Sequence, residues 1–133
     1  MKSIHKKIIP IALLLLTVAA ISLAVYLKQV MDYKRAVNAI SIEELDLSKI
    51  PDGIYYGEYD VGFIYAKVEV VLNDGKIAKI TILEHKNDRG ASAEVIVENI
   101  VAQQRLDVDA VSGATNSSAV LKRAVMDALL GDK

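Results

Sequence analysis

An uncharged apolar run of 20 residues, from Ile8 to Leu27, constrains the fold of this chain more than any other feature of its sequence. A helix that rises about 1.5 Å per residue needs this length to cross a hydrocarbon core of about 30 Å. Three lysines precede the run, at positions 2, 6 and 7, and the positive-inside rule keeps such a basic end in the cytoplasm. We therefore expect a cytoplasmic N-terminus at residues 1–7, a transmembrane anchor at 8–27 in contact with membrane lipid, and an extracytoplasmic remainder.

A cleavable signal peptide is the alternative interpretation of the same segment. The small-residue patterns Val18-Ala19-Ala20 and Ser22-Leu23-Ala24 would suit a signal peptidase. The apolar run is longer than a typical signal core and continues to Tyr26 without a polar break, which favours an uncleaved anchor. No cysteine follows it, which excludes lipid attachment at a cysteine.

Residues 28–49 have the sequence of a stalk or linker. Apolar side chains recur at helical spacing from Lys28 to Ala39, so the helix is expected to continue beyond the apolar run. Ser41 and Glu44 match a capping box, which predicts one further short helical turn. A Pro-Asp-Gly sequence at 51–53 then interrupts the chain, and a folded domain is expected over residues 50–133.

The remaining sequence predicts a small α+β domain. Strands are expected at 54–59, 63–72 and 77–83, and Asn73-Asp74-Gly75 is typical of a hairpin turn between the last two. Alternate residues of the middle strand are apolar, so one face of an antiparallel sheet needs cover; they are Ile64, Ala66, Val68, Val70 and Leu72. Helical spacing of apolar residues predicts that helices at 92–104 and 117–130 supply this cover, with 106–111 as another strand or an extended connection. The expected fold class is therefore a small antiparallel sheet covered by two helices and preceded by one transmembrane helix.

Charge and residue content exclude several classes of function. Three of the 16 basic residues precede the apolar run, so 13 basic and 17 acidic residues follow it, and the domain would be repelled by nucleic acid. The absence of cysteine excludes disulfides, thiolate zinc sites, iron–sulfur clusters and thiol nucleophiles. With only two histidines no His-cluster metal site is expected, and no nucleotide-binding glycine motif is present. A redox function would therefore need an organic cofactor, or histidine and carboxylate ligands.

The run Asp-Ala-Val-Ser-Gly-Ala-Thr, from Asp109 to Thr115, lies where the last predicted helix begins. A threonine hydroxyl becomes a phosphoester only where a phosphate can reach it, and the small residues Gly113 and Ala114 are expected to leave that access open. The first N–H groups of a helix have no partner within the helix, and the helix dipole adds about half a positive charge there. An anionic phosphate beside Thr115 is therefore expected to be stabilised.

Short polar side chains around the threonine extend this candidate phosphate site; they belong to Ser112, Asn116, Ser117 and Ser118. They could donate to phosphate oxygens or cap the helix. The alternative interpretation is a capping cluster before an ordinary helix, which is the more common outcome for so short a motif taken alone.

The run resembles the attachment motif of the FMN-binding domain family, which includes the flavin-bearing subunits of bacterial sodium-pumping quinone reductases and of Rnf-type electron-transport complexes. Five residues match the motif position by position, namely Asp109, Ser112, Gly113, Ala114 and Thr115, whereas Asn116 occupies a variable place. The resemblance covers residues 50–130. The sequence from Asp52 to Gly57 is similar to the family's opening Asp-Gly-x-Tyr-x-Gly strand, and the hairpin Asn-Asp-Gly-Lys, a strand ending in Glu84-His85, a helix and the motif follow in the family's order.

The resemblance implies how these parts act. Thr115 would carry FMN by a phosphoester bond, with the matching residues Asp109, Ser112, Gly113 and Ala114 around it. Asn116 and Ser117 join them as candidate FMN contacts because of their place at the helix start, not because of the resemblance. A separate flavin transferase would load the chain, with FAD as donor and a divalent metal in that enzyme, so this chain would be a substrate of the reaction and not its catalyst. The implied protein is a membrane-anchored extracytoplasmic electron carrier that serves a membrane redox partner or a quinone reductase.

Two other functions stay open at this point. A binding or sensory module would hold FMN, or another phosphate-bearing ligand, non-covalently at the same helix start. A pure interaction domain would bind no flavin at all.

His85 and Arg89 are further candidates outside the motif. His85 lies at the end of a predicted strand, before the polar loop 86–90, and ligand contacts concentrate in such loops. It could contact the flavin or tune its electronics. The alternative is a half-exposed histidine that makes one hydrogen bond. Arg89 could approach the phosphate or only be solvated.

Overall fold

The computed structural model describes residues 2–87 and 90–131, and of residues 2–7 the backbone alone. Along the chain the elements are α1 (Lys2–Asn38), η1 (Leu47–Lys49), β1 (Gly53–Asp60), β2 (Tyr65–Asn73), β3 (Lys76–Lys86), η2 (Ala91–Val95), α2 (Ile96–Gln103) and α3 (Thr115–Leu130). The elements η1 and η2 are 3₁₀ helices. The chain divides into two compact units, Met1–Lys34 and Arg35–Lys133.

The first unit consists of most of α1. Among the described residues, Ile8–Asn38 is the one helix long and apolar enough to cross a membrane, judged by length and composition. Its large apolar side chains from Ile8 to Leu27 are half or more exposed, so lipid would have to supply the burial that an apolar helix needs. The expected continuation of the helix beyond Leu27 is confirmed as far as Asn38. A signal sequence shares this length and composition, so the choice of an uncleaved anchor stays a prediction.

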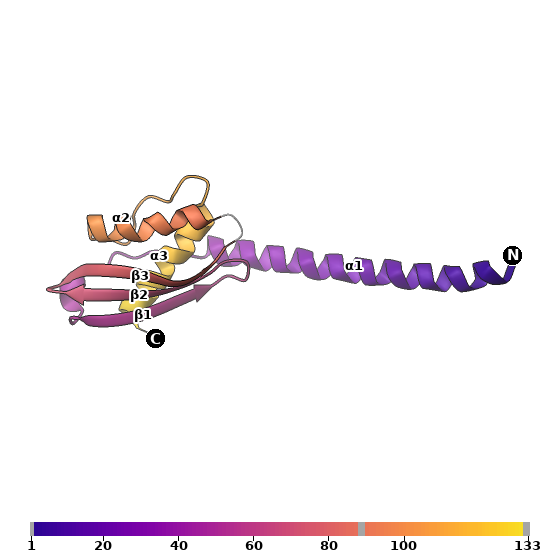
Figure 1. The fold of residues 1–133 in the computed structure, drawn as a ribbon, viewed down its shortest axis with the longest axis horizontal. Coiled ribbons are helices and arrows are strands. Elements are labelled where there is room, and N and C mark those ends of the chain that lie inside the picture. The colour runs from indigo at the N-terminus through magenta and orange to yellow at the C-terminus, as the bar shows by residue number, and fades with distance from the viewer. Residues whose placement is uncertain (1, 88–89, 132–133) are drawn as a thin grey trace. The chain divides into compact units, whose positions relative to one another are not determined.

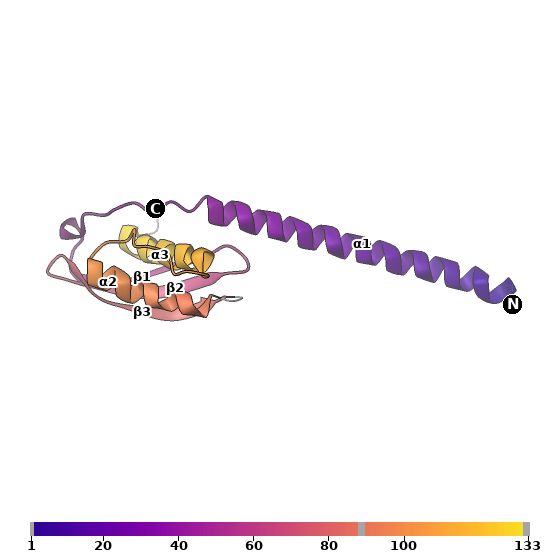
Figure 2. The ribbon, with the colours of Figure 1, turned by 90° about the horizontal axis from the view of Figure 1, so that it is seen from above.

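The second unit is built on a three-stranded sheet in the order β1-β2-β3, with both strand pairs antiparallel. Both α2 and α3 lie on the same face of this sheet (Figures 1 and 2), with α3 over β1 and β2 and α2 over β3. In the hairpin between β2 and β3, Asp74 and Gly75 have φ values of 52° and 69°, as a two-residue type I′ turn requires. The expected fold class is confirmed.

The core lies between the sheet and the two helices. All five apolar residues predicted for the covered face of the middle strand are buried, from Ile64 to Leu72. They meet the apolar stripe of α3, whose buried members include Val120, Leu121, Ala124, Val125, Ala128 and Leu129. Each large apolar side chain removed from water contributes about 1.5–3 kcal/mol, so this contact fixes the position of α3 on the sheet.

Several element boundaries differ from the expectations. The third strand, expected at 77–83, continues to Lys86, so the strand includes His85 and the first residue of the expected loop. The predicted helix at 92–104 is the 3₁₀ helix η2 followed by α2, and the last helix begins at Thr115, two residues earlier than expected. Residues 106–111 form an irregular connection, the second of the two forms expected for them.

The predicted capping box at Ser41 and Glu44 is wrong. Residues 41–46 have no regular structure, and the short helical turn that follows is η1, whose cap is Asp46 with its carboxylate accepting from the Ser48 N–H. The Glu44 carboxylate instead accepts from the backbone N–H of Asp107 at 3.1 Å and pairs with Arg105 at 3.5 Å. A long-range contact therefore takes the side chain that a local cap would have used.

Candidate functional site

A tight turn places Thr115 at the start of α3. The N–H of Ala114 donates to the Val111 carbonyl at 3.0 Å, which closes a turn over residues 111–114. Gly113, at the third position, has φ 78°, the value a type II turn needs there and one that L side chains rarely adopt. The chain enters the helix directly after this turn, and Thr115 is its exposed first residue.

The start of α3 fits an anionic group. Its N-cap residue is Ala114, which has no side chain able to accept from the N–H groups of the first turn. This is unlike the usual Ser, Thr, Asp or Asn cap, so the interpretation of the cluster as an ordinary capping sequence loses its main support. A phosphate on Thr115 would meet the positive end of the helix dipole and could accept from backbone N–H groups there.

The structure divides the predicted site residues into an exposed and a buried group. The exposed residues are Asp109, Ser112, Gly113, Thr115 and Asn116, which lie on one continuous stretch of the chain. Ala114 and Ser117 are buried, with 5% and 3% of their surface exposed. The small side chain of Ala114 therefore packs beneath the turn. Open space lies at Gly113, where a Cβ atom would meet nothing within 4 Å, while the access that Ala114 leaves to Thr115 stays a prediction.

Ser118 lies in the protein interior and hydrogen-bonds to the turn. Its surface is completely buried, and its hydroxyl oxygen accepts from the Val111 N–H at 3.0 Å. The Val111 carbonyl accepts from Ala114 within the turn, so both backbone groups of Val111 are satisfied. The hydroxyl of Ser118 thus holds the turn against the helix that follows it.

Ser117 joins this turn to a second segment. A Cβ atom at Gly90 would lie 1.9 Å from the Ser117 hydroxyl oxygen and 2.5 Å from its Cβ atom. Gly90, the residue before η2, therefore lies directly against the first turn of α3. Only glycine leaves room for this contact at position 90.

His85 lies on the covered face of the sheet, beside Ala66 in the strand register. Its side chain is 2% exposed, and its Nδ1 atom lies 3.0 Å from a carboxylate oxygen of Glu94 in η2. Its Nε2 atom is buried without a hydrogen-bond partner among the described residues. The buried ring favours a packing role that joins β3 to η2, while direct contact with a flavin stays a prediction. Arg89 lies outside the described residues.

Lys122 is a residue of the site that sequence reasoning missed. The side chain is 11% exposed, and its ammonium group donates to the Val108 carbonyl at 2.9 Å and to the Asp107 carboxylate at 3.3 Å. It lies four residues after Ser118, inside the apolar stripe of the helix. A lysine within an apolar stripe is the sequence feature that could have identified this residue.

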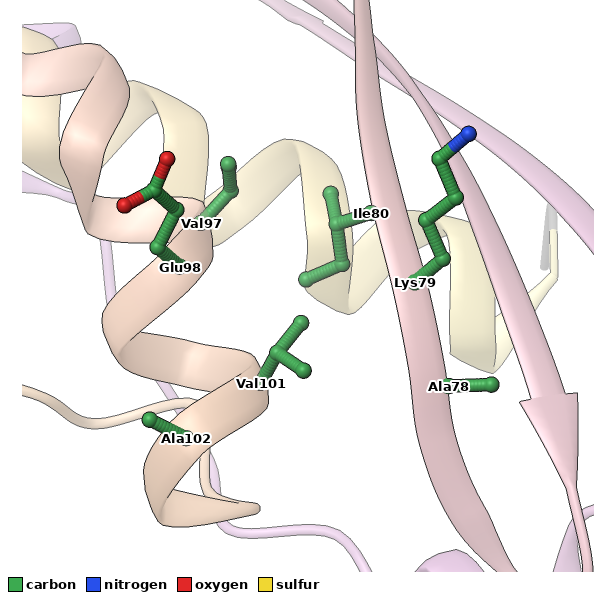
Figure 3. Close-up of a pocket in the computed structure, with 7 residues that line it drawn as sticks. All are labelled: Ala78, Lys79, Ile80, Val97, Glu98, Val101 and Ala102. Atoms are coloured by element: carbon green, nitrogen blue, oxygen red, sulfur yellow. The ribbon is translucent and has the colours of Figure 1, made fainter.

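A hollow of about 320 Å³ lies elsewhere, between α2 and β3. Val97 and Val101 of α2 and Ile80 of β3 line it, and Val101 points toward Ile80 across it (Figure 3). No residue of the Asp109–Thr115 run lines this hollow, so it is a feature separate from the start of α3.

Comparison with protein families assigns the domain. The model of the FMN-binding domain matches residues 62–130, just over half of the 133-residue chain. This chain belongs to the FMN-binding domain family. Comparison with curated proteins and with solved structures gave no match. The family match supports a flavin-binding protein with FMN as its cofactor, and the matched residues include the turn at 111–114 and the whole of α3 with Thr115.

Gly113→Ala is expected to lower the free energy of unfolding by about 1–2 kcal/mol, the usual cost of a left-handed conformation for an L residue. The cost comes from the backbone alone, because a Cβ atom at this position would meet nothing within 4 Å. Gly113→Asn is the matched control, since asparagine tolerates positive φ. Denaturant unfolding of both variants checks this, and equal losses would show that conformation is not the cause.

Proposed function

We propose that this chain is a membrane-anchored, extracytoplasmic electron-transfer flavoprotein whose FMN is bound through a phosphoester to Thr115. A separate flavin transferase attaches the cofactor. The membrane span is residues 8–27, and a membrane redox partner or quinone reductase exchanges electrons with the bound flavin.

The observation that carries this proposal is the position of Thr115. Its side chain is exposed at the first residue of α3, after a turn whose glycine leaves open space and next to an N-cap with no capping side chain. The family match supplies the cofactor. An exposed hydroxyl at the positive end of a helix is the arrangement that attachment of an anionic phosphate requires.

The attachment reaction balances with FAD as donor. The Thr115 hydroxyl oxygen forms a bond to the phosphorus nearer the riboflavin, and the bond from that phosphorus to the oxygen bridging the two phosphates breaks. AMP leaves, and the hydroxyl proton passes to a base of the transferase. The chain contributes position and access to this reaction. No oxidation or reduction occurs in it.

A covalent tether suits an extracytoplasmic carrier, because a cofactor lost by dissociation outside the cell would be diluted beyond recovery. When bound, FMN supplies the electron transfer, and the protein positions, shields and tunes it. The helix α1 would hold the domain near its membrane partners.

Intact-mass measurement of the full chain tests the proposal. The chain co-produced with a flavin transferase is expected to gain one FMN less one water, and the gain is expected to survive denaturation. Thr115→Ala should abolish it. Thr81→Val is the matched control, because this other threonine has a buried hydroxyl without a hydrogen-bond partner among the described residues; it should keep the full gain.

Each alternative gives a different result. A flavin that is released on unfolding would identify a non-covalent binding or sensory module and reject the phosphoester. A colourless chain of unchanged mass, in the presence of a transferase that modifies a known substrate, would reject flavin attachment altogether. A gain that persists in Thr115→Ala would place the attachment on another residue.

A further inference from the structure

Among the described residues, the polar ones that are buried as whole residues are Ser117, Ser118 and Lys122. All three lie in the first half of α3, beside the turn that carries Thr115. Two of them, Ser118 and Lys122, are four residues apart on the same side of the helix and reach back to the connection that precedes it. Polar groups therefore interrupt the buried apolar stripe of α3 in its first half.

The two side chains hold successive parts of this connection. The Ser118 hydroxyl accepts from the N–H of Val111, the first residue of the turn. The Lys122 ammonium group donates to the carbonyl of Val108, three residues earlier, and to the neighbouring Asp107 carboxylate. The backbone of residues 107–111 is thus bound to α3 at two points.

Stability alone does not account for a lysine at this place. A buried charge costs several kcal/mol in lost hydration, and replacing such an ionic contact with an apolar side chain of similar size is often neutral or stabilising. Apolar neighbours such as Leu121 and Val125 already fill the same stripe. The charge is best explained by the conformation that it fixes.

We infer that Ser118 and Lys122 are positioning residues for flavin attachment. They fix the connection from Asp107 to Val111, and through it the turn at 111–114, so that the Thr115 hydroxyl is presented to the transferase in one orientation. This inference rests on the proposed function. The physical reason is that a reacting group held in its productive geometry reacts much faster than one that samples many.

The test compares attachment rates with stability in the full chain, purified in detergent micelles and incubated with a flavin transferase, FAD and Mg²⁺. Lys122→Met and Ser118→Ala are expected to lower the attachment kcat/KM about tenfold or more. The melting temperature of Lys122→Met should stay equal to the wild-type value or rise. Lys122→Arg should recover most of the rate, because a guanidinium group also donates to a carbonyl and a carboxylate.

Arg123→Met is the matched control on the same helix. Arg123 pairs with Asp127 at 2.8 Å and lies over the Tyr59 ring at 5.2 Å, and neither contact involves residues 107–114. This variant should load at the wild-type rate even if its melting temperature falls. If Arg123→Met instead loads slowly, in proportion to its loss of stability, the inference is overturned. Helix stability would then be the cause of slow loading in all the variants.

Hydrogen exchange supplies a readout that needs no flavin. In the unloaded chain, Ser118→Ala should speed exchange of the Val111 amide at least tenfold relative to amides in the middle of β2, because its acceptor is lost. Unchanged Val111 exchange together with wild-type loading of Ser118→Ala overturns the inference. If Lys122→Met fails to fold, Ser118→Ala decides by these same two measurements. Failure of the wild-type chain to load, with a transferase active on another substrate, would instead reject the proposed function.

Discussion

Replacing Gly57 with alanine is expected to lower the free energy of unfolding by about 3 kcal/mol or more, the upper range for overpacking a core. Gly57 is the point at which α3 lies directly on β1. A Cβ atom there would lie 2.2 Å from the Ala124 carbonyl oxygen and 2.3 Å from the Ala128 nitrogen. Both are backbone atoms of a helix, so the contact cannot be relieved by rotating a side chain. The helix would have to move off the sheet.

Gly53→Ala is the control in the same strand. A Cβ atom at Gly53 would have its nearest contact at 3.7 Å, with the Tyr55 ring, which is an ordinary van der Waals distance. Its effect should remain within about 1 kcal/mol, the cost or gain of a glycine change where the backbone permits it. Denaturant unfolding of the two full-chain variants, followed by circular dichroism, measures the difference. Equal stability of Gly57→Ala and Gly53→Ala would show that α3 does not press on β1 as the structure has it.

Gly90→Ala is expected to cost about 1–3 kcal/mol through overpacking at the start of α3. The added methyl would collide with both side-chain atoms of Ser117. Because Ser117 lies in the first turn of the helix, two residues after Thr115, the same change should slow flavin attachment if the proposed function holds. The effect on stability needs no flavin and is measured first.

A double-mutant cycle with Ser117→Gly separates this collision from other effects of the alanine. Ser117→Gly removes both atoms that the new methyl would meet, so the Gly90→Ala, Ser117→Gly double variant should be more stable than the sum of the two single losses predicts. A coupling of about 0.5–3 kcal/mol is expected for residues in direct contact. Additive losses would mean that the alanine acts elsewhere, and the packing of Gly90 on Ser117 would need revision.

The parts predicted from sequence are those that depend on local periodicity. The apolar run at 8–27 gave a helix of sufficient length, and the alternation from Ile64 to Leu72 identified the buried face of β2. The Asn-Asp-Gly turn follows from the conformations that these residue types tolerate. Each of these patterns lies within one continuous stretch of the chain, so no tertiary information was needed to predict the element from it.

The predictions for Glu44 and His85 depended on contacts between segments that are distant in the sequence. Glu44 had a local partner position at Ser41, but its carboxylate binds the N–H of Asp107, 63 residues away. His85 was expected either to contact the flavin or to be half exposed with one hydrogen bond, and the structure leaves its side chain 2% exposed with Glu94 of η2 against its ring. Local propensity takes no account of a partner that is distant in the sequence. Tertiary contacts can therefore override it, as they do at both residues.

The sequence by itself determined that the chain has an apolar span, a small α+β domain and a threonine at a helix start, within a motif similar to that of FMN-binding domains. Only the tertiary structure decided that Thr115 is exposed while Ala114 and Ser117 are buried, and that Ser118 and Lys122 hold the preceding connection. The physical reason is that residue type and spacing fix backbone conformation and amphipathic faces. The burial and pairing of a polar side chain depend on which distant segment packs against it.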